Sequence, residues 1–291
     1  FWGDTNRVRY PLGNFHTTGA VSKLPADGGL DPDAGVDLNY FAGEKGFVKP
    51  VAKMPGEGPT WLSGLAVLPD RKGRDRLVAF YVKVKPPLTV YEKGLCEWDD
   101  EAEEFRKVLV FPEDVETVPN GHPVRVRSED ADVIYYADPL PTMRMEASYE
   151  SWKDPAQYEA IDSVEAFHDS DGNRVKPHRG SIAWNDYRKK WVMIFCQTGG
   201  KTSYLGEIWY AEADAPEGPC KNCVKVDTHD RYAFYNPKQH PYFAKEEGRF
   251  IYFEGTYTAM FSKAPFKTPK YNYNQIMYRL DLSDERLRPL K

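Results

Sequence analysis

The sequence predicts an all-β fold, a five-bladed β-propeller that forms a single domain over residues 1–291. Two observations predict it. Short runs rich in β-branched and aromatic residues dominate the chain, with turn clusters that hold many of its 22 glycines and 23 prolines. These runs also recur as a triplet: a strand of small residues, a strongly apolar strand after a charged turn, and an aromatic strand. A repeat of about 50 residues built from successive antiparallel strands is typical of a propeller.

The repeat is most regular at the ends of its apolar middle strands. Four copies of the triplet occupy residues 61–91, 124–147, 178–212 and 240–280. A fifth middle strand ends at Asp4 and its third strand covers 15–21, so we expect the first blade to be incomplete at its start. The middle strands end near Asp4, Lys83, Asp138, Gln197 and Glu254. A β-sandwich with accidental spacing is the alternative.

Composition excludes several classes of protein. The chain has 39 Lys and Arg against 44 Asp and Glu, a net charge of −5, which argues against a basic nucleic-acid surface. No apolar run approaches the roughly 20 residues of a membrane span. HExxH, P-loop, GxGxxG and GxSxG motifs are absent from the sequence, which argues against metalloproteases, NTPases, dehydrogenases and α/β-hydrolases.

The four cysteines are too few for a disulfide scaffold. Cys96 and Cys196 lie in apolar runs, where we expect buried thiols. Cys220 and Cys223 form a single CxxC without the second pair that a zinc ribbon needs, so we expect a local disulfide across a surface loop. Such a disulfide favours an exported protein, secreted or periplasmic.

The propeller predicts where the chemistry lies. Residues at the ends of second strands and at the starts of first and third strands converge on one funnel. The expected catalytic carboxylates there are Asp4, Asp138 and Glu254. The expected substrate-binding residues are His16, Trp61, Lys83, Arg144, His178, Arg179, Gln197, Tyr204, His240 and Asn274.

Carboxylates beside aromatic and basic groups can have separated pKa values, which acid–base catalysis with two carboxyl groups requires. Aromatic rings would stack on sugars, and Arg and Lys would bind hydroxyls or an anionic group. Each carboxylate also has a structural alternative. Asp4 can cap a turn, Glu254 can pair with an arginine, and Asp138 before a proline can be a turn residue.

No cofactor is expected, but two acidic loops allow a structural calcium ion. The loop from Asp31 to Asp37 has closely spaced carboxylates without the closing glutamate of an EF-hand. The loop from Asp169 to Asn173 is equally explained as a turn.

Three segments carry a resemblance to a known family: 1–5 (Phe-Trp-Gly-Asp-Thr), 208–214 with Gly218 and Pro219, and 273–280. The chain resembles the five-bladed propeller glycosidases. It is most similar to the endo-D-arabinanase-like family, once a domain of unknown function, and more distantly to the arabinanase and xylosidase propellers. The resemblance implies that Asp4, in Gly-Asp-Thr, is a catalytic carboxylate. The family's second aspartate has no counterpart in residues 18–25, and Asp27 is the nearest acid.

The favoured hypothesis is therefore a glycoside hydrolase that acts on a poly- or oligosaccharide. Asp4 would be nucleophile or general base, Glu254 the general acid, and Asp138 would tune a pKa or position the substrate. Arg179, His240 and Gln197 would hold the sugar, with Trp61 as platform. Carboxylates about 5 Å apart would indicate retention of configuration, and about 6.5–9.5 Å inversion. A non-catalytic carbohydrate-binding propeller and a polysaccharide lyase remain alternatives. The oligomeric state is open.

Overall fold

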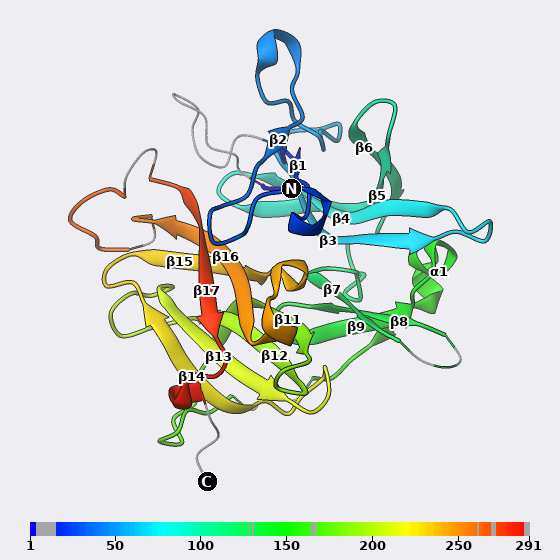
Figure 1. Cartoon of the computed structure of the whole chain (residues 1–291). Helices are drawn as coiled ribbons and strands as arrows, with labels where there is room; N and C mark the ends of the chain where they lie inside the picture. Colours follow the sequence, from blue (N-terminus) through cyan, green and yellow to red (C-terminus); the bar gives the residue numbers. More distant parts are fainter. Residues whose placement is uncertain are drawn as a thin grey trace. The chain divides into compact units, whose positions relative to one another are not determined.

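Figure 1 shows the computed structural model of the chain, which describes residues 1–3, 16–127, 129, 131–163, 167–260, 262–268 and 272–287. The fold is an all-β propeller. Its described strands form four sheets of three or four strands, and each sheet is built from strands in chain order. The chain also divides into two compact units. The first holds residues 1–30, 35–136 and 143–160, and the second holds 31–34, 137–142 and 161–291.

The first two sheets begin in the first unit. One consists of β3 (Thr60–Pro69), β4 (Asp75–Lys85), β5 (Thr89–Asp99) and β6 (Glu104–Val110). The other consists of β7 (His122–Val126), β8 (Val133–Ala137), β9 (Pro141–Glu146) and β10 (Glu159–Ala160), with the short helices α1 (Tyr149–Lys153) and η3 (Pro155–Gln157) between its last two strands. Their shared core includes Leu68, Val78, Tyr136 and Trp152, all buried.

The other two sheets lie in the second unit. One consists of β11 (Pro177–Asn185), β12 (Lys190–Gln197), β13 (Glu207–Ala213) and β14 (Lys221–Thr228). The last consists of β15 (Ala233–Gln239), β16 (Phe250–Thr258) and β17 (Asn274–Asp281). Strand β12 is buried from Trp191 to Cys196, since both of its faces are covered, and this explains its unbroken apolar sequence.

Charged turns join the first and second strands, as the sequence predicts. The Asp70 carboxylate accepts the backbone N–H groups of Lys72 (2.8 Å) and Arg74 (3.0 Å), and Gly73 takes a positive φ of 73°. In the β11–β12 hairpin the Asn185 Oδ1 atom accepts the Arg188 N–H at 2.8 Å. Local side-chain bonds of this kind stabilise tight turns and so fix the register of the strands they connect.

The count of full blades differs from the prediction. The described residues show four full sheets where the sequence predicted five blades. The N-terminal segment forms only a short ladder: Trp2 pairs with Thr18, Thr17 pairs with Ala52, and β1 (Ala20–Val21) pairs with β2 (Asn39–Tyr40). The predicted middle strand at Asp4 falls outside the described residues.

The predicted disulfide is wrong. Cys220 and Cys223 are separate buried thiols. Cys223 lies inside β14, and Cys220 precedes that strand. The cysteine argument for export therefore falls away. Cys96 and Cys196 are buried free thiols, as predicted.

The described part of the chain holds no helix with both the length and the apolar character that a membrane span requires.

Candidate functional site

The carboxyl group of Asp138 is held by the first strand of the next sheet. Asp138 follows β8, and its Oδ1 atom accepts the backbone N–H of Gly180 on β11 at 3.0 Å. Its Oδ2 atom accepts a hydrogen bond from the Arg179 guanidinium. The Asp138 side chain is 18% exposed. Burial raises the pKa of Asp138 above its ordinary value, against the opposing pull of Arg179, the Gly180 N–H and His178.

His178 lies beside this pair. Its Nδ1 atom is 3.6 Å from the buried Cys196 thiol on β12. Burial, and then the neighbouring Arg179 charge, lower the pKa of His178. The imidazole therefore favours its neutral form, which can both donate and accept a hydrogen bond.

The second carboxylate, Glu254, lies on β16. His240, which follows β15, places its Nε2 atom 3.4 Å from Glu254 Oε1. Lys238 on β15 stands directly opposite Glu254 in the strand pairing. Burial opposes ionisation of Glu254, but the hydrogen bond and charge of His240 and the charge of Lys238 outweigh it and lower the pKa of Glu254.

Asp138 is hydrogen-bonded to β11, and Glu254 stands opposite β15 in the strand pairing. These two strands contact each other. Gln239, next to Lys238, donates its backbone N–H to Ser181 Oγ at 2.8 Å. Its side-chain amide donates to the carbonyls of Ser181 and Val192, both at 3.0 Å. Ser181 adjoins Gly180, which binds Asp138. Buried hydrogen bonds thus fasten β15 to β11 and β12 between the two acidic groups.

Three other predicted residues of the second unit lie at strand ends or in loops. Gln197 ends β12 and pairs with Pro177. Tyr204 lies in the loop before β13 with 58% of its surface exposed. Asn274 begins β17, and its amide donates to Thr268 Oγ1 at 3.1 Å. The ring of Tyr204 is thus open to a ligand, whereas the Asn274 amide already supports its own loop.

In the first unit, Lys83 is fully buried and its ammonium donates to three backbone carbonyls: Met54 (3.1 Å), Gly56 (3.2 Å) and Gly58 (2.9 Å). An ammonium has three N–H donors, so none remains for a substrate. Burial lowers the pKa of Lys83. Lys83 therefore shapes the loop before β3 rather than binding sugar.

The other predicted residues of this unit are also engaged. Arg144 forms a two-pronged ion pair with Glu159 of β10, at 2.6 and 2.8 Å. His16 Nδ1 accepts the Thr60 N–H at 3.1 Å, and burial with the charges of Lys83 and Lys53 lowers the pKa of His16 to about 4. Trp61 lies in β3 and is partly exposed. Asp4 lies outside the described residues, and Asp27 is exposed in the short helix η1 (Pro25–Asp27).

The acidic loops have partners other than a metal ion. Lys245 donates to both Asp31 (2.6 Å) and Asp33 (2.8 Å), and Asp33 also accepts from Tyr252 (2.9 Å) and Arg279 (3.2 Å). Lys245 and Arg279 thus pair with the carboxylates that the sequence left open as a calcium site.

The second acidic loop is a turn. The Asp169 carboxylate accepts the backbone N–H groups of Asp171 and Asn173, at 3.0 and 2.8 Å. Within the described ranges no cluster of His, Cys, Asp and Glu has the arrangement of a metal site.

Lys238 is the site residue that the sequence analysis missed. Between Tyr235 and Lys238, β15 carries one residue more than β16, and Asn236 takes a positive φ of 54°. This bulge resets the alternation of side chains and brings Lys238 opposite Glu254. The Asn236–Pro237 pair was the available signal, since Asn tolerates positive φ and Pro is found at bulges.

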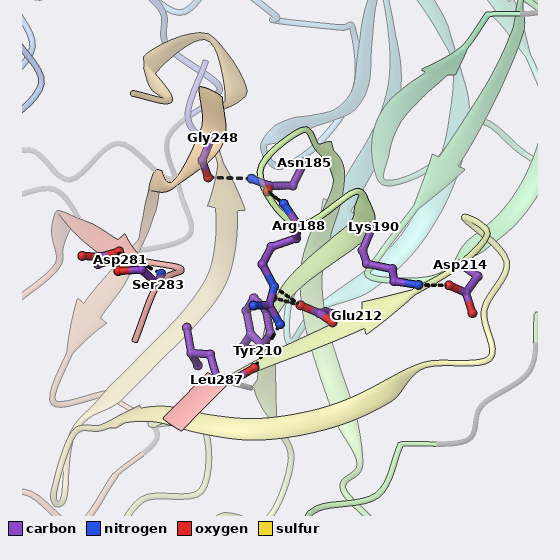
Figure 2. A network of polar contacts seen from close by, with 10 residues as sticks. All are labelled: Asn185, Arg188, Lys190, Tyr210, Glu212, Asp214, Gly248, Asp281, Ser283 and Leu287. Atoms are coloured by element: carbon purple, nitrogen blue, oxygen red, sulfur yellow. Dashed lines mark hydrogen bonds and ion pairs between the residues drawn. The ribbon is translucent and has the colours of Figure 1, made fainter. Parts of the chain in front are cut away.

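A separate polar network lies at the other end of β12, where the strand begins at Lys190 (Figure 2). Arg188 binds Glu212 at 2.5 Å and the Leu287 carbonyl at 3.3 Å, and Tyr210 also donates to Glu212. The Arg188 and Glu212 side chains are 15% and 8% exposed. This network ties the hairpin to the C-terminal turn η6 (Glu285–Leu287), far along the strand from Gln197.

Comparison with solved structures supports the fold. An exo-β-1,3-galactanase from Phanerochaete chrysosporium, solved with β-1,3-galactotriose, is 11% identical and has a TM-score of 0.52, over 97% of this chain and 63% of that chain. The arabinanase of Bacillus subtilis is 10% identical, with a TM-score of 0.44 over 93% and 95% of the two chains. A protein from Bacteroides ovatus, described as a putative hydrolase, is 12% identical, with a TM-score of 0.47 over 76% of this chain and 60% of that chain.

The chain thus spans only about 60% of the length of two of these proteins. No family model and no curated protein matches the sequence. At such low identity the galactanase shows the fold, an all-β propeller.

Proposed function

We propose that this protein is a glycoside hydrolase that cleaves a poly- or oligosaccharide, with Asp138 as general acid and Glu254 as general base or nucleophile. One observation carries the proposal. Two partly buried carboxyl groups face contacting strands, Asp138 as an acceptor from Gly180 of β11 and Glu254 opposite Lys238 of β15, and their surroundings move their pKa values in opposite directions. Separated pKa values are what divides the acid and base roles between two carboxyl groups.

These roles differ from those expected from the sequence, which made Glu254 the acid. A general acid must hold its proton at the working pH, and burial favours the neutral form of Asp138. A base or nucleophile must be ionised, and His240 and Lys238 favour the charged form of Glu254. Asp4 lies outside the described residues and has no part in these roles, while we propose the short N-terminal ladder as the fifth blade.

The substrate would be held by the partly or fully exposed groups around the two carboxylates. Arg179 fixes the Asp138 carboxyl group, while His178 and Gln197 present hydrogen-bonding groups and Tyr204 presents an open aromatic face. Aromatic faces and fixed polar groups together are the usual means of orienting a polar ligand. The fold adds support, since the galactanase of similar fold acts on a polysaccharide. We further propose that the protein is exported, because polysaccharides lie outside the cell.

A lyase would need free cations to neutralise a uronate. Lys83 and Arg144, expected to do so, are bound to carbonyls and to Glu159, and Arg179 is bound to Asp138. These contacts remove the three cations on which the lyase alternative relied, and the products of the reaction decide between hydrolysis and elimination.

The test is a screen of polysaccharides and oligosaccharides that records both reducing ends and ultraviolet-absorbing unsaturated products. We expect saturated products and a loss of about 10²-fold or more in kcat with Asp138→Asn or Glu254→Gln. Asp186→Asn is the matched control, an exposed carboxylate in the turn at the other end of β11. Unsaturated products would establish a lyase. Binding without any product would establish a carbohydrate-binding propeller, and unchanged rates in both variants would refute the assigned roles.

A further inference from the structure

Most cations of the second unit are neutralised by a partner. Arg179 binds Asp138, Arg188 binds Glu212, and Lys245 binds Asp31 and Asp33. Lys238 differs, because it has neither a hydrogen bond nor an ion pair with any residue that the structure describes. The other lysines of this unit in the same situation, where their side chains are described, are exposed: Lys176, Lys201, Lys263 and Lys267. Lys238 is therefore the one partly buried lysine there with all three donors open.

The position of Lys238 is defined by the strand pairing. It stands directly opposite Glu254 across β15 and β16, so the two side chains leave the sheet on the same face. His240 binds Glu254 at 3.4 Å, which leaves the carboxylate supported by the imidazole rather than by the ammonium. Burial lowers the pKa of Lys238, and the charge of Glu254 opposes this by favouring the protonated form. An amine with free N–H donors, whose protonated form an anionic ligand would favour, thus lies beside the proposed base.

A partly buried ammonium without a hydrogen-bond acceptor has lost hydration that nothing in the described protein replaces. An anionic group compensates best for this lost hydration, because a charge-assisted hydrogen bond is about twice as strong as a neutral one. A sugar hydroxyl would satisfy one donor but not the charge. Uronate carboxylates and sulfate esters both supply charged oxygens on a glycan.

We propose that Lys238 is a specificity-determining residue that binds an anionic substituent, a carboxylate or a sulfate, on the sugar chain that occupies the site. The substrate class is then an acidic glycan rather than a neutral one. This inference rests on the proposed function, since it places the anion beside the bond that Asp138 and Glu254 would cleave.

The experiment compares acidic glycans with matched neutral forms: uronate-containing polysaccharides against their carboxyl-reduced forms, and sulfated against desulfated polysaccharides. The whole chain is used throughout. We expect wild-type protein to prefer one acidic form by about tenfold or more in kcat/KM, and the preferred pair identifies the anion. Lys238→Met should bring the ratio close to one, and Lys238→Arg should keep most of it. Lys190→Met is the charge-matched control, at the far end of β12, and should keep the full ratio.

Stability separates this role from a structural one. If Lys238 only supported Glu254, Lys238→Met would lower Tm. We expect Tm to stay level or rise, because the substitution removes a partly buried charge that has no ion pair in the described structure.

The outcomes separate the two proposals. Equal rates on acidic and neutral forms, unchanged by Lys238→Met, would overturn the anion site and leave the hydrolase standing. No product from any glycan would overturn the hydrolase, and calorimetric titration with the same matched pairs would then decide the anion site. Preferential binding of an acidic form that Lys238→Met abolishes would support it, and equal or absent binding would refute it.

Discussion

His240 bridges a carboxylate and a phenol. Its Nε2 atom lies 3.4 Å from Glu254 Oε1, and its Nδ1 atom lies 2.6 Å from the Tyr242 hydroxyl. The backbone N–H of His240 donates to the Tyr252 carbonyl on β16 at 2.8 Å, which holds the ring in place. The imidazole therefore stabilises ionised Glu254 from a fixed position.

Removing this imidazole should move the acid limb of the pH profile. His240 lowers the pKa of Glu254, so His240→Phe should raise that pKa while burial remains. Glu254 would then lose its proton only at higher pH, and kcat/KM would fall at low pH while recovering at higher pH. Tyr242→Phe is the control because it keeps the contact with Glu254. An unchanged acid limb in His240→Phe would rule out Glu254 as the titrating base.

The stability of the protein should also depend on the ionisation of Glu254. A glutamate whose folded pKa is depressed contributes stability above its unfolded pKa, about 4.3, and that contribution is lost as the pH falls through the folded value. His240→Phe should remove part of this contribution at neutral pH and flatten the fall in Tm at acidic pH. Differential scanning calorimetry from neutral to acidic pH measures it. A fall in Tm with pH that is as steep in His240→Phe as in the wild type would argue against the ion pair of His240 and Glu254.

Lys83 should matter for stability. Lys83→Ala leaves three backbone carbonyls, that of buried Met54 among them, without their donor, and we expect a loss of roughly 2–4 kcal/mol in urea unfolding. Added butylammonium should restore part of it, whereas tetramethylammonium, which has no N–H, should not. Lys85→Met is the control, since Lys85 is exposed two residues along β4. Equal stability of the two variants would refute the role of the ammonium.

The Arg188 network should stabilise the fold without affecting chemistry. Arg188→Met strands the buried Glu212 charge, which typically costs about 3–5 kcal/mol. The exposed pair of Lys190 and Asp214 in Figure 2 is expected to contribute below about 1 kcal/mol, so Lys190→Met serves as the control. Chemical denaturation compares them. Similar losses in the free energy of unfolding of both variants would show that Arg188→Met does not leave a buried, unpaired charge on Glu212.

The four cysteines should behave as thiols. Under denaturing conditions a thiol reagent should titrate four groups, and in the native protein almost none, because all four are buried. Reductant should leave Tm unchanged. Two titratable groups, with a Tm lowered by reductant, would instead support a bond between Cys220 and Cys223.

Residue patterns predicted four of the middle strands, because charged turns and apolar runs are local signals. The ends of β8 and β12 fall next to Asp138 and at Gln197 as predicted, whereas β16 continues past Glu254 to Thr258 and Asp4 lies outside the described residues. Asp70 and Asn185 do cap the turns where hairpins were expected. The pairing of Asp138 with Arg179 was not predicted, since it joins residues of different sheets. Lys238 was missed because a bulge at Asn236 resets the alternation of side chains along β15. The free thiols of Cys220 and Cys223 escaped prediction because the CxxC spacing does not reveal whether the backbone is extended or turned.

The strict chain order of the strands in every full sheet has a consequence for how the protein is made. Each sheet can form from neighbouring hairpins as soon as its own segment is synthesised, without waiting for distant sequence. The sheet of β15 to β17 carries Glu254 and is complete only when β17 (Asn274–Asp281) has been made. Ribosome-stalled chains that end before residue 274 should therefore hold Glu254 on an unfinished sheet, and activity should arise only after β17 has been synthesised.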